Sequence, residues 1–224
     1  MIRKISFLLL WLAFTSYAFL LAPGDQSDTL PLIQKLSTGQ WQGINPCIIA
    51  LFNLMGIWPM VYGGVLFADG RGQKVPAWPF AAASFGVGAF AILPYLAFRK
   101  PALAFAGEPD RLLKFWDSRW LAMVLGGGAI ALFGYGLTQG DWGDFIQQWQ
   151  TSRFIHVMSL DFCLLSLLFS TLIKDDLHRR KMNSQWWLLS LIPLLGPITY
   201  LIVRPSLNDS SRQQKTPLFA GKSS

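Results

Sequence analysis

The chain has 224 residues, of which 52% are hydrophobic and only 14% are charged, and its mean hydropathy is +0.37. Its formal net charge is +7, but the basic residues are dispersed through short segments between apolar stretches. A nucleic-acid-binding protein would gather them into a basic patch or domain, so this distribution argues against that class. Contact with anionic lipid headgroups, or simple anchoring of membrane helices, accounts better for them, above all for the run from His178 to Lys181.

The dominant feature of the sequence is a set of six long apolar stretches. Each has about the 17–25 residues that a helix needs to cross a hydrocarbon core of about 30 Å. Backbone groups in lipid must be hydrogen-bonded within their own segment, so these stretches are expected to be helices rather than strands. The sequence therefore predicts an all-α protein, a polytopic transmembrane helical bundle of about six membrane helices. The predicted spans are 5–22, 44–68, 78–98, 120–137, 154–173 and 186–203.

The two ends of the chain differ from the rest. Arg3 and Lys4 precede the first apolar stretch, a pattern common to cleaved secretory signals and to retained signal anchors. The stretch is long for a signal, so we expect a retained helix, with cleavage near Ala18 or Ala22 as the alternative. From residue 206 the chain is polar and rich in Ser, Lys and Gln. We predict one transmembrane helical domain over 1–205 and a disordered polar tail over 206–224.

The distribution of positive charge does not determine the orientation of six spans. The two ends and the even-numbered loops together carry nine Lys and Arg residues, and the odd-numbered loops carry ten. The positive-inside rule cannot choose between these numbers. Either one span does not cross fully, or helix packing overrides the charge bias.

Two segments between the spans have apolar residues at helical spacing and are predicted to be short interfacial helices. The first covers 109–120, where Pro109 suits a helix start and Asp117 lies on the polar face. The second covers 141–149. Both are expected to contact lipid or a partner, or simply to anchor the adjacent spans. Their apolar faces comprise Leu112, Leu113, Trp116 and Trp120 in the first segment, and Trp142, Phe145, Ile146 and Trp149 in the second.

Proline occurs in the second, third and sixth predicted spans and not in the other three. A membrane helix tolerates proline when its neighbours satisfy the carbonyl groups that the kink frees. We therefore expect these three helices to be the adaptable elements that form a site. The residues concerned are Pro46 and Pro59, Pro79 and Pro94, and Pro193 and Pro197.

Asp161 is the acidic residue well inside a predicted span, about 10 Å along the fifth helix at 1.5 Å per residue. An ionisable residue in the membrane is a functional-site hypothesis by default. It could bind a proton or cation, or it could make a structural contact with Arg119, Arg153 or Asn53. The candidate intramembrane polar site consists of Asp161, His156, Asn53 and Tyr95.

The fifth predicted helix also carries a polar stripe. At 100° per residue His156 lies about 140° from Asp161, so the two do not form a ready acid–base pair. The stripe is expected to be a seam between helices, with a solvated path as the alternative. Its members are His156, Ser159, Cys163, Ser166 and Ser170.

The inventory of reactive residues argues against an enzyme. Glu108 is the one glutamate, and His156 and His178 are the only histidines, so an intramembrane His/Glu metal site is not expected. No second intramembrane aspartate completes an aspartyl pair. Ser84 lacks the glycine pattern of a nucleophile elbow, and an enzyme hypothesis would require Ser84 within hydrogen-bond reach of His156. Cys47 and Cys163 are expected to be free thiols in apolar helices.

Several motifs resemble one protein family. They are the segments 52–59, 75–80 and 154–162, together with the closing pattern Gly196-Pro197-x-x-Tyr200-Leu201-x-x-Arg204-Pro205. These residues resemble an uncharacterised family of polytopic membrane proteins of cyanobacteria and plastids, and the resemblance covers about residues 44–205. It implies a photosynthetic membrane, the thylakoid or plasma membrane of a cyanobacterium, and it supplies no catalytic residues.

The function expected from these observations is that of a non-enzymatic integral membrane protein. It would assist the assembly, stability or cofactor loading of larger membrane complexes, with lipids and other membrane or pigment–protein complexes as partners. The alternative is a small proton- or ion-coupled transporter or channel that uses Asp161. The sequence indicates no particular cofactor and no nucleic-acid partner.

Overall fold

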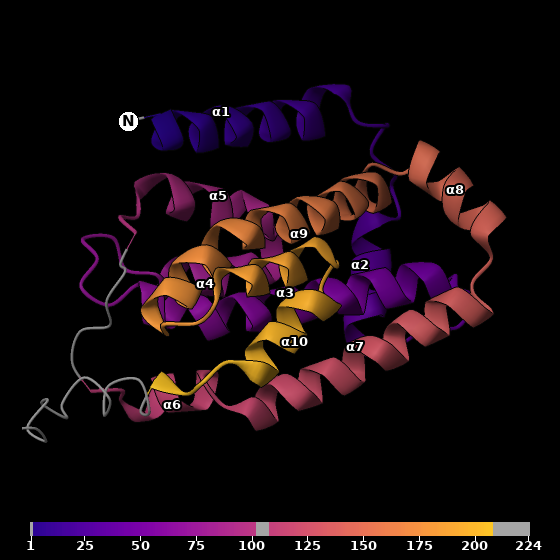
Figure 1. Cartoon of the computed structure of the whole chain (residues 1–224). Coiled ribbons are helices and arrows are strands. Elements are labelled where there is room, and N and C mark those ends of the chain that lie inside the picture. Colours follow the sequence, from indigo (N-terminus) through magenta and orange to yellow (C-terminus); the bar gives the residue numbers. More distant parts are fainter. Residues whose placement is uncertain (1, 102–107, 208–224) are drawn as a thin grey trace, which may run out of the picture.

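The computed structural model describes residues 2–101 and 108–207, and every regular element within these ranges is helical (Figure 1). Four helices are long and apolar enough to cross a membrane, and they coincide with the first, second, fourth and fifth predicted spans. The prediction of an all-α chain is therefore confirmed. The four are α1 (Ile2–Ser16), which continues through the π-helical turn η1 (Tyr17–Leu21), then α3 (Pro46–Asp69), α7 (Arg119–Gln139) and α9 (Arg153–Arg179).

The remaining two predicted spans are not continuous helices. Residues 78–98 form α4 (Trp78–Val87) and α5 (Ala89–Phe98), and residues 186–203 fall within η2 (Ser184–Leu191) and α10 (Leu195–Val203). Each pair is short, and the chain turns between its two members. We call the first pair the first hairpin and the second pair the second hairpin.

Each hairpin begins and ends at the same end of the molecule. The first hairpin starts a short loop after α3, and its end returns to α3, because Arg99 Nη1 lies 2.8 Å from Oδ1 of Asp69. The second starts just after α9, and its end returns there, because Arg204 Nη1 lies 3.1 Å from Oδ2 of Asp176. Neither hairpin therefore traverses the length of the bundle.

The breaks at the hairpin tips come from two residues with positive φ. Gly88 has φ 50° and ψ −125°, a conformation that a residue with a Cβ atom rarely adopts. Leu194 has φ 56° and is fully buried, so the surrounding packing holds it in a strained conformation. Proline does not place these breaks by itself, because Pro59 and Pro94 lie inside the continuous helices α3 and α5.

Three further helices are short: α2 (Thr29–Thr38), α6 (Arg111–Trp116) and α8 (Trp142–Thr151). The predicted helix over 141–149 is confirmed by α8, which Asp141 caps by accepting from the Asp144 amide at 3.0 Å. The predicted helix over 109–120 is wrong in extent, because α6 ends at Trp116 and α7 starts at Arg119. Nothing in the sequence interpretation anticipated α2.

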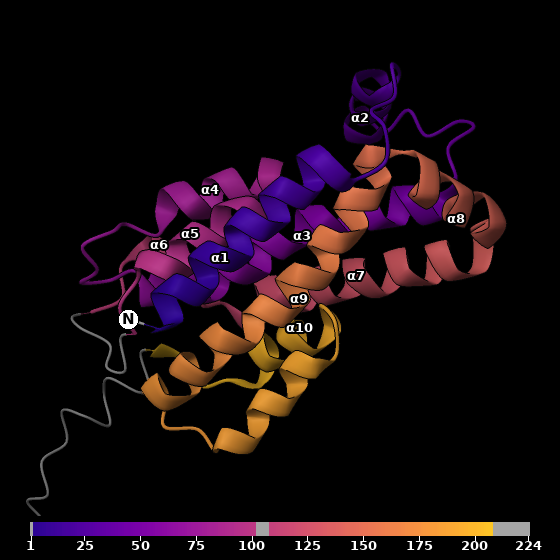
Figure 2. The same cartoon turned by 90° about the horizontal axis from the view of Figure 1, so that it is seen from above.

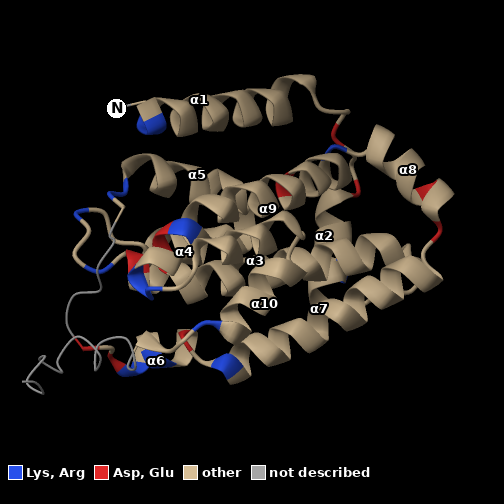
Figure 3. Ribbon diagram, viewed as in Figure 1, with Lys and Arg blue, Asp and Glu red and all other residues tan. Residues whose placement is uncertain are grey.

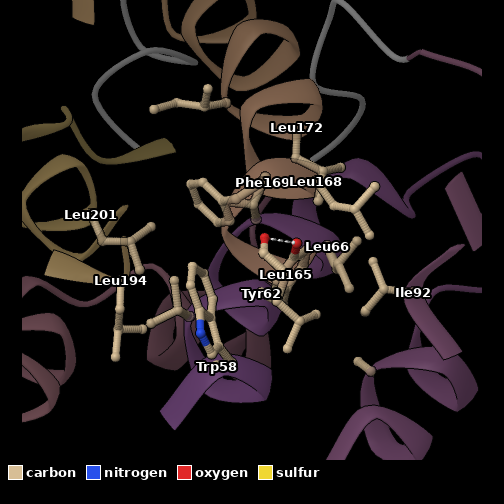
Figure 4. Packing of buried hydrophobic residues seen from close by; sticks show 14 of the residues in the cluster. Trp58, Tyr62, Leu66, Ile92, Leu165, Leu168, Phe169, Leu172, Leu194 and Leu201 are labelled. Carbon is tan, nitrogen blue, oxygen red and sulfur yellow. Dashed lines mark hydrogen bonds between the residues drawn. The ribbon is translucent and has the colours of Figure 1, made fainter. Parts of the chain in front are cut away.

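The core is centred on the parallel pair α3 and α9 (Figure 4). Trp58 and Tyr62 of α3 are fully buried against Phe169 of α9, with ring centroids 6.3 and 5.5 Å from that of Phe169. The Tyr62 hydroxyl donates to the Leu165 carbonyl at 2.7 Å. Leu194 at the second tip joins the same cluster, so the hairpins pack directly on this central pair.

Basic residues gather at one end of the bundle (Figure 3). We call the basic end the one where α1 and α7 begin and α3, α5, α9 and α10 end. Among the described residues, every Lys and Arg lies at or near this end except Lys35 and Arg153. The opposite end holds α2, α8 and the helix ends beside them (Figure 1).

The two chain ends are anchored to different extents. Arg3 donates to the Arg99 carbonyl, and Trp11 Nε1 donates to the Phe90 carbonyl at 3.0 Å, so α1 lies along α5 (Figure 2). Leu207, inside the predicted tail, is buried, and its amide donates to Asp117 Oδ2 at 2.8 Å. The rest of that predicted disordered tail, 208–224, lies outside the described residues.

Candidate functional site

Asp161 lies at the tip of the first hairpin. It is 95% buried about a third of the way along α9, and its Oδ1 accepts a hydrogen bond from the Ala89 amide at 2.8 Å. Ala89 is the first residue of α5, where a helix N-terminus favours a negative charge. A Cβ atom added to Gly88 would lie 1.8 Å from Oδ2 of Asp161, so only glycine allows this approach. The contact that the sequence suggested with Arg119, Arg153 or Asn53 is not made.

A cavity of about 680 Å³ adjoins Asp161. Its walls come from α1 and η1, the first half of α3, the tip of the first hairpin and the first half of α9. Most of the surface is apolar, including Trp11, Phe52 and Met158. Phe19 and Phe85 line it and are also more than half exposed, so the cavity opens onto the outer surface. A pocket of this size and composition is typical of small-molecule sites.

Two polar atoms in this cavity have no hydrogen-bond partner among the described residues. Oδ2 of Asp161 accepts no hydrogen bond, and the buried Thr15 hydroxyl has no partner. A buried polar atom without a partner costs free energy, so the Thr15 hydroxyl favours a ligand or water that satisfies it. Oδ2 of Asp161 is available as a further acceptor on the cavity wall. Asp25 and Arg153 lie at the other end of the cavity, near the end of the bundle opposite the basic end.

His156 does not join Asp161. Its Nε2 lies 2.8 Å from the Tyr17 hydroxyl and its Nδ1 lies 2.9 Å from the Trp149 carbonyl, and its ring stacks on Trp149. These contacts tie η1 and α8 to the start of α9. The predicted polar stripe is not a continuous seam, because Cys163 in its middle is exposed and Ser166 donates to the carbonyl of Phe162 in its own helix.

The other two candidate residues lie elsewhere. The Asn53 side chain donates to the Ile49 carbonyl of its own helix at 2.8 Å. Tyr95 is fully buried near the basic end and donates to Asp69 Oδ2 at 2.7 Å. The four residues that the sequence grouped as one polar site therefore occupy separate places, and Asp161 alone lines the cavity.

The Ser84–His156 contact that an enzyme hypothesis would require is not made. The Ser84 hydroxyl donates to the Ala81 carbonyl at 2.7 Å, and both ring nitrogens of His156 have other partners. No group of three or more His, Cys, Asp and Glu side chains in the described ranges could hold a metal ion.

Sequence reasoning missed a second polar feature, a buried ionic cluster at the basic end. Asp176 and Asp69 are fully buried, and Arg179 bridges them at 2.7 and 3.1 Å. Burial alone would lower the pKa of Arg180, but Asp176 and Asp117 outweigh it and raise the pKa above its usual value. The ionic cluster consists of Asp69, Asp117, Asp175, Asp176, Arg99, Arg179, Arg180, Arg204, Tyr95 and Tyr200.

The ionic cluster fastens both hairpins to the central helices. Arg99 follows α5 and Arg204 follows α10, and each binds an aspartate near the end of α3 or α9. Arg204 also donates to the Gly64 carbonyl of α3 at 2.8 Å. Buried charges of opposite sign with these hydrogen bonds hold the hairpin ends in fixed positions.

Comparison with protein-family models, with curated proteins and with solved structures finds no match for the chain.

Proposed function

We propose that the chain is an integral membrane protein in which four helices cross the bilayer and both hairpins enter it and leave it from the basic end. Non-helical backbone at membrane depth is tolerated where protein or a cavity surrounds it, and both tips are buried. The proposal replaces the six crossings expected from apolar length. Because basic loops stay on the cytoplasmic side, the basic end faces the cytoplasm.

Cysteine labelling separates four crossings from six. In a chain whose own cysteines are replaced by alanine, Lys74→Cys and Arg111→Cys flank the first hairpin at exposed positions. With four crossings a membrane-impermeant maleimide labels both from the same side, and Lys35→Cys is labelled from the other side. Labelling of Lys74→Cys and Arg111→Cys from opposite sides would refute the re-entrant first hairpin.

We further propose that the protein is a non-enzymatic binding protein for an amphiphilic small molecule taken from the bilayer. The cavity beside Asp161 is the observation that carries this function. Its walls suit an apolar body, and the free Oδ2 of Asp161 suits a cationic or hydrogen-bond-donating polar end. Thr15 offers a second hydrogen-bonding group. Such binding would serve the expected role in assembly, stability or cofactor loading of larger membrane complexes.

A matched pair of glycine variants tests the binding function. A Cβ atom on Gly56, which lines the cavity, or on Gly127 of α7 would meet nothing within 4 Å. Gly56→Phe should fill the cavity without disturbing the fold, whereas Gly127→Phe should point away from it. After mild solubilisation, mass spectrometry should find an amphiphile bound to the wild type and to Gly127→Phe, and little bound to Gly56→Phe. Equal retention by all three proteins would mean that the cavity is not the binding site.

A proton- or cation-coupled carrier is the second candidate function. It is favoured by the position of Asp161 within α9 at a break between two half-helices, an arrangement from which transporter sites are built. In proteoliposomes, flux that Asp161→Asn abolishes and Asp110→Asn leaves intact would support it. If the protein binds an amphiphile but shows no proton or cation flux, only the binding function would remain supported.

The photosynthetic setting rests on the family resemblance and remains a proposal. It predicts that the protein co-purifies with a larger pigment–protein complex from thylakoid or plasma membranes of a cyanobacterium. Loss of that complex in a strain that carries Gly56→Phe, but not in one that carries Gly127→Phe, would link the cavity to assembly. An unchanged complex in both strains would separate the cavity from any assembly role.

A further inference from the structure

The helices of the chain follow one another in the same order twice. The first half runs through the long helix α1, the short α2, the long α3 and the first hairpin. The second half runs through the long helix α7, the short α8, the long α9 and the second hairpin, and α6 lies between the halves. α1 packs on α5 as α7 packs on α10, and α4 packs on α3 as η2 packs on α9. The two halves are therefore structural equivalents.

Equivalent side chains make equivalent contacts in the two halves. A Tyr-Leu-x-x-Arg sequence ends each hairpin, and in each half its Tyr and Arg bind the aspartate near the end of the preceding long helix. Arg3 at the start of α1 donates to the Arg99 carbonyl, and Arg119 at the start of α7 donates to the Arg204 carbonyl. The corresponding sets are Asp69, Tyr95 and Arg99 in the first half, and Asp176, Tyr200 and Arg204 in the second.

The Asp161 cavity also has a counterpart, and the counterpart is much smaller. A smaller cavity of about 140 Å³ lies between α3, α7 and α8. Four residues of α3 line it at the same spacing as four of the five α9 residues that line the large cavity. Each set of four ends fifteen residues before the buried aspartate, Asp69 or Asp176, near the end of the same helix. The sets are Cys47, Ala50, Leu51 and Leu54 in the small cavity, and Phe154, Val157, Met158 and Asp161 in the large one.

The difference in volume comes from the first helix of each half. α7 packs along α3, where a Cβ atom on Gly136 would lie 2.8 Å from Cβ of Ala50. α1 does not pack along α9 in this way; it lies on α5 and reaches α9 mainly through Tyr17 and His156. The π-helical turn η1 ends the first helix beside the cavity, whereas α7 is α-helical throughout. Single π-helical turns are common at functional sites.

We propose that α1 is a lateral gate of the Asp161 cavity. In the state described here the gate is open to the bilayer, and an amphiphile enters between α1 and α9. Once the ligand binds Asp161, α1 moves toward α9 and covers the ligand. The packing of α1 on α9 then approaches the packing that α7 already has on α3. This inference rests on the proposed binding function and adds the route and the closing movement to it.

The contacts of α1 suit such a movement. α1 is the least buried of the four long helices, so few side chains must separate from partners when it moves. Arg3, Trp11 and Phe14 make its polar and aromatic contacts with α5 and with Arg99 directly after it, and Tyr17 contacts His156 of α9. α1 can thus pivot on α5, which stays in place, while the distance between α1 and α9 changes.

Distances between spin labels test the gate. In a chain without its native cysteines, Leu12→Cys on α1 and Leu167→Cys on α9 occupy exposed positions. Pulsed electron paramagnetic resonance on the full chain in nanodiscs would compare a long-chain alkylamine with a fatty acid of equal length. The alkylamine should shift the distribution toward the separation of packed helices, about 8–10 Å between axes. The fatty acid should not, because Asp161 would repel its carboxylate.

Two controls make the result decisive. The pair Val124→Cys and Leu167→Cys, on α7 and α9, should keep its distance, and Gly56→Phe should abolish the shift of the α1–α9 pair. An α1–α9 distance that ignores the alkylamine, although mass spectrometry shows the alkylamine bound, would overturn the gate and leave the binding function standing. Loss of binding altogether would overturn both.

Discussion

Replacing Asp176 by asparagine should destabilise the protein more than any single change at its surface. Asp176 is fully buried and accepts from Arg179 at 2.7 Å, from Arg180 at 2.8 Å and from Arg204 at 3.1 Å. Tyr200 donates to it as well, at 2.7 Å. Asparagine keeps the size of the side chain but removes the charge, and its amide group would face guanidinium donors instead of accepting from them.

The expected loss follows from these contacts. Removing one partner of a buried ion pair costs about 3–5 kcal/mol, because the remaining charge stays buried without compensation. Arg179 would retain Asp69, and both Arg180 and Arg204 would retain Asp117, so the loss should stay within that range rather than reach the sum of four interactions. This is a large share of the roughly 5–15 kcal/mol that stabilises a typical protein.

Asp110→Asn provides the matched control. Asp110 pairs with Arg71 at a site where its side chain is 61% exposed, and an exposed pair contributes only about 0–1 kcal/mol. Asparagine also preserves the cap that Asp110 gives to α6. Unfolding of both variants in detergent micelles, followed by tryptophan fluorescence and circular dichroism, would measure the difference. Similar losses of stability for the two variants would refute the view that the ionic cluster fastens the hairpins.

Glycine positions give two further predictions. Gly88→Ala should lower stability by about 1–3 kcal/mol, since it combines a positive φ with a collision against Asp161, and the same unfolding assay would show it; wild-type stability would contradict the tip geometry. Gly136→Leu should cost about 1–3 kcal/mol by forcing α7 away from Ala50, while Gly127→Leu, which faces open space, should change stability by less than 1 kcal/mol. Comparable unfolding midpoints for these two leucine variants would show that α7 is not closely packed on α3.

Most of the fold prediction rested on the length of the continuous apolar stretches. A continuous apolar run of membrane-spanning length identified α1, α3, α7 and α9, because each of them is a single long helix. The same criterion could not separate a continuous helix from two half-helices that turn back. Gly88 is a residue type that readily adopts positive φ, so the sequence gives some indication of the first tip. Leu194 adopts positive φ only because its buried surroundings enforce it, and no local sequence pattern predicts that conformation.

The candidate site was predicted in part. Asp161 stood out because an acid inside an apolar helix is costly, and it does line the cavity. Its partner could not be predicted, because the Ala89 amide belongs to a helix start that exists only if the hairpin is broken. The sequence does not single out Asp69 and Asp176, because an acid at the edge of an apolar stretch resembles an ordinary solvated flank. The repeated Tyr-Leu-x-x-Arg sequence was the signal that could have revealed them.

The hairpins also bear on the orientation that charge counting left undecided. Six crossings place the loop after α3 and the loop after α5 on opposite sides, which divides the basic residues almost equally between the two faces. If both hairpins return to the side they came from, those loops join the N-terminus and the loop after α9 on one face. Among the described residues only Lys35 and Arg153 then remain on the other face. With re-entrant hairpins the basic residues lie mostly on one face, so the positive-inside rule predicts a single orientation.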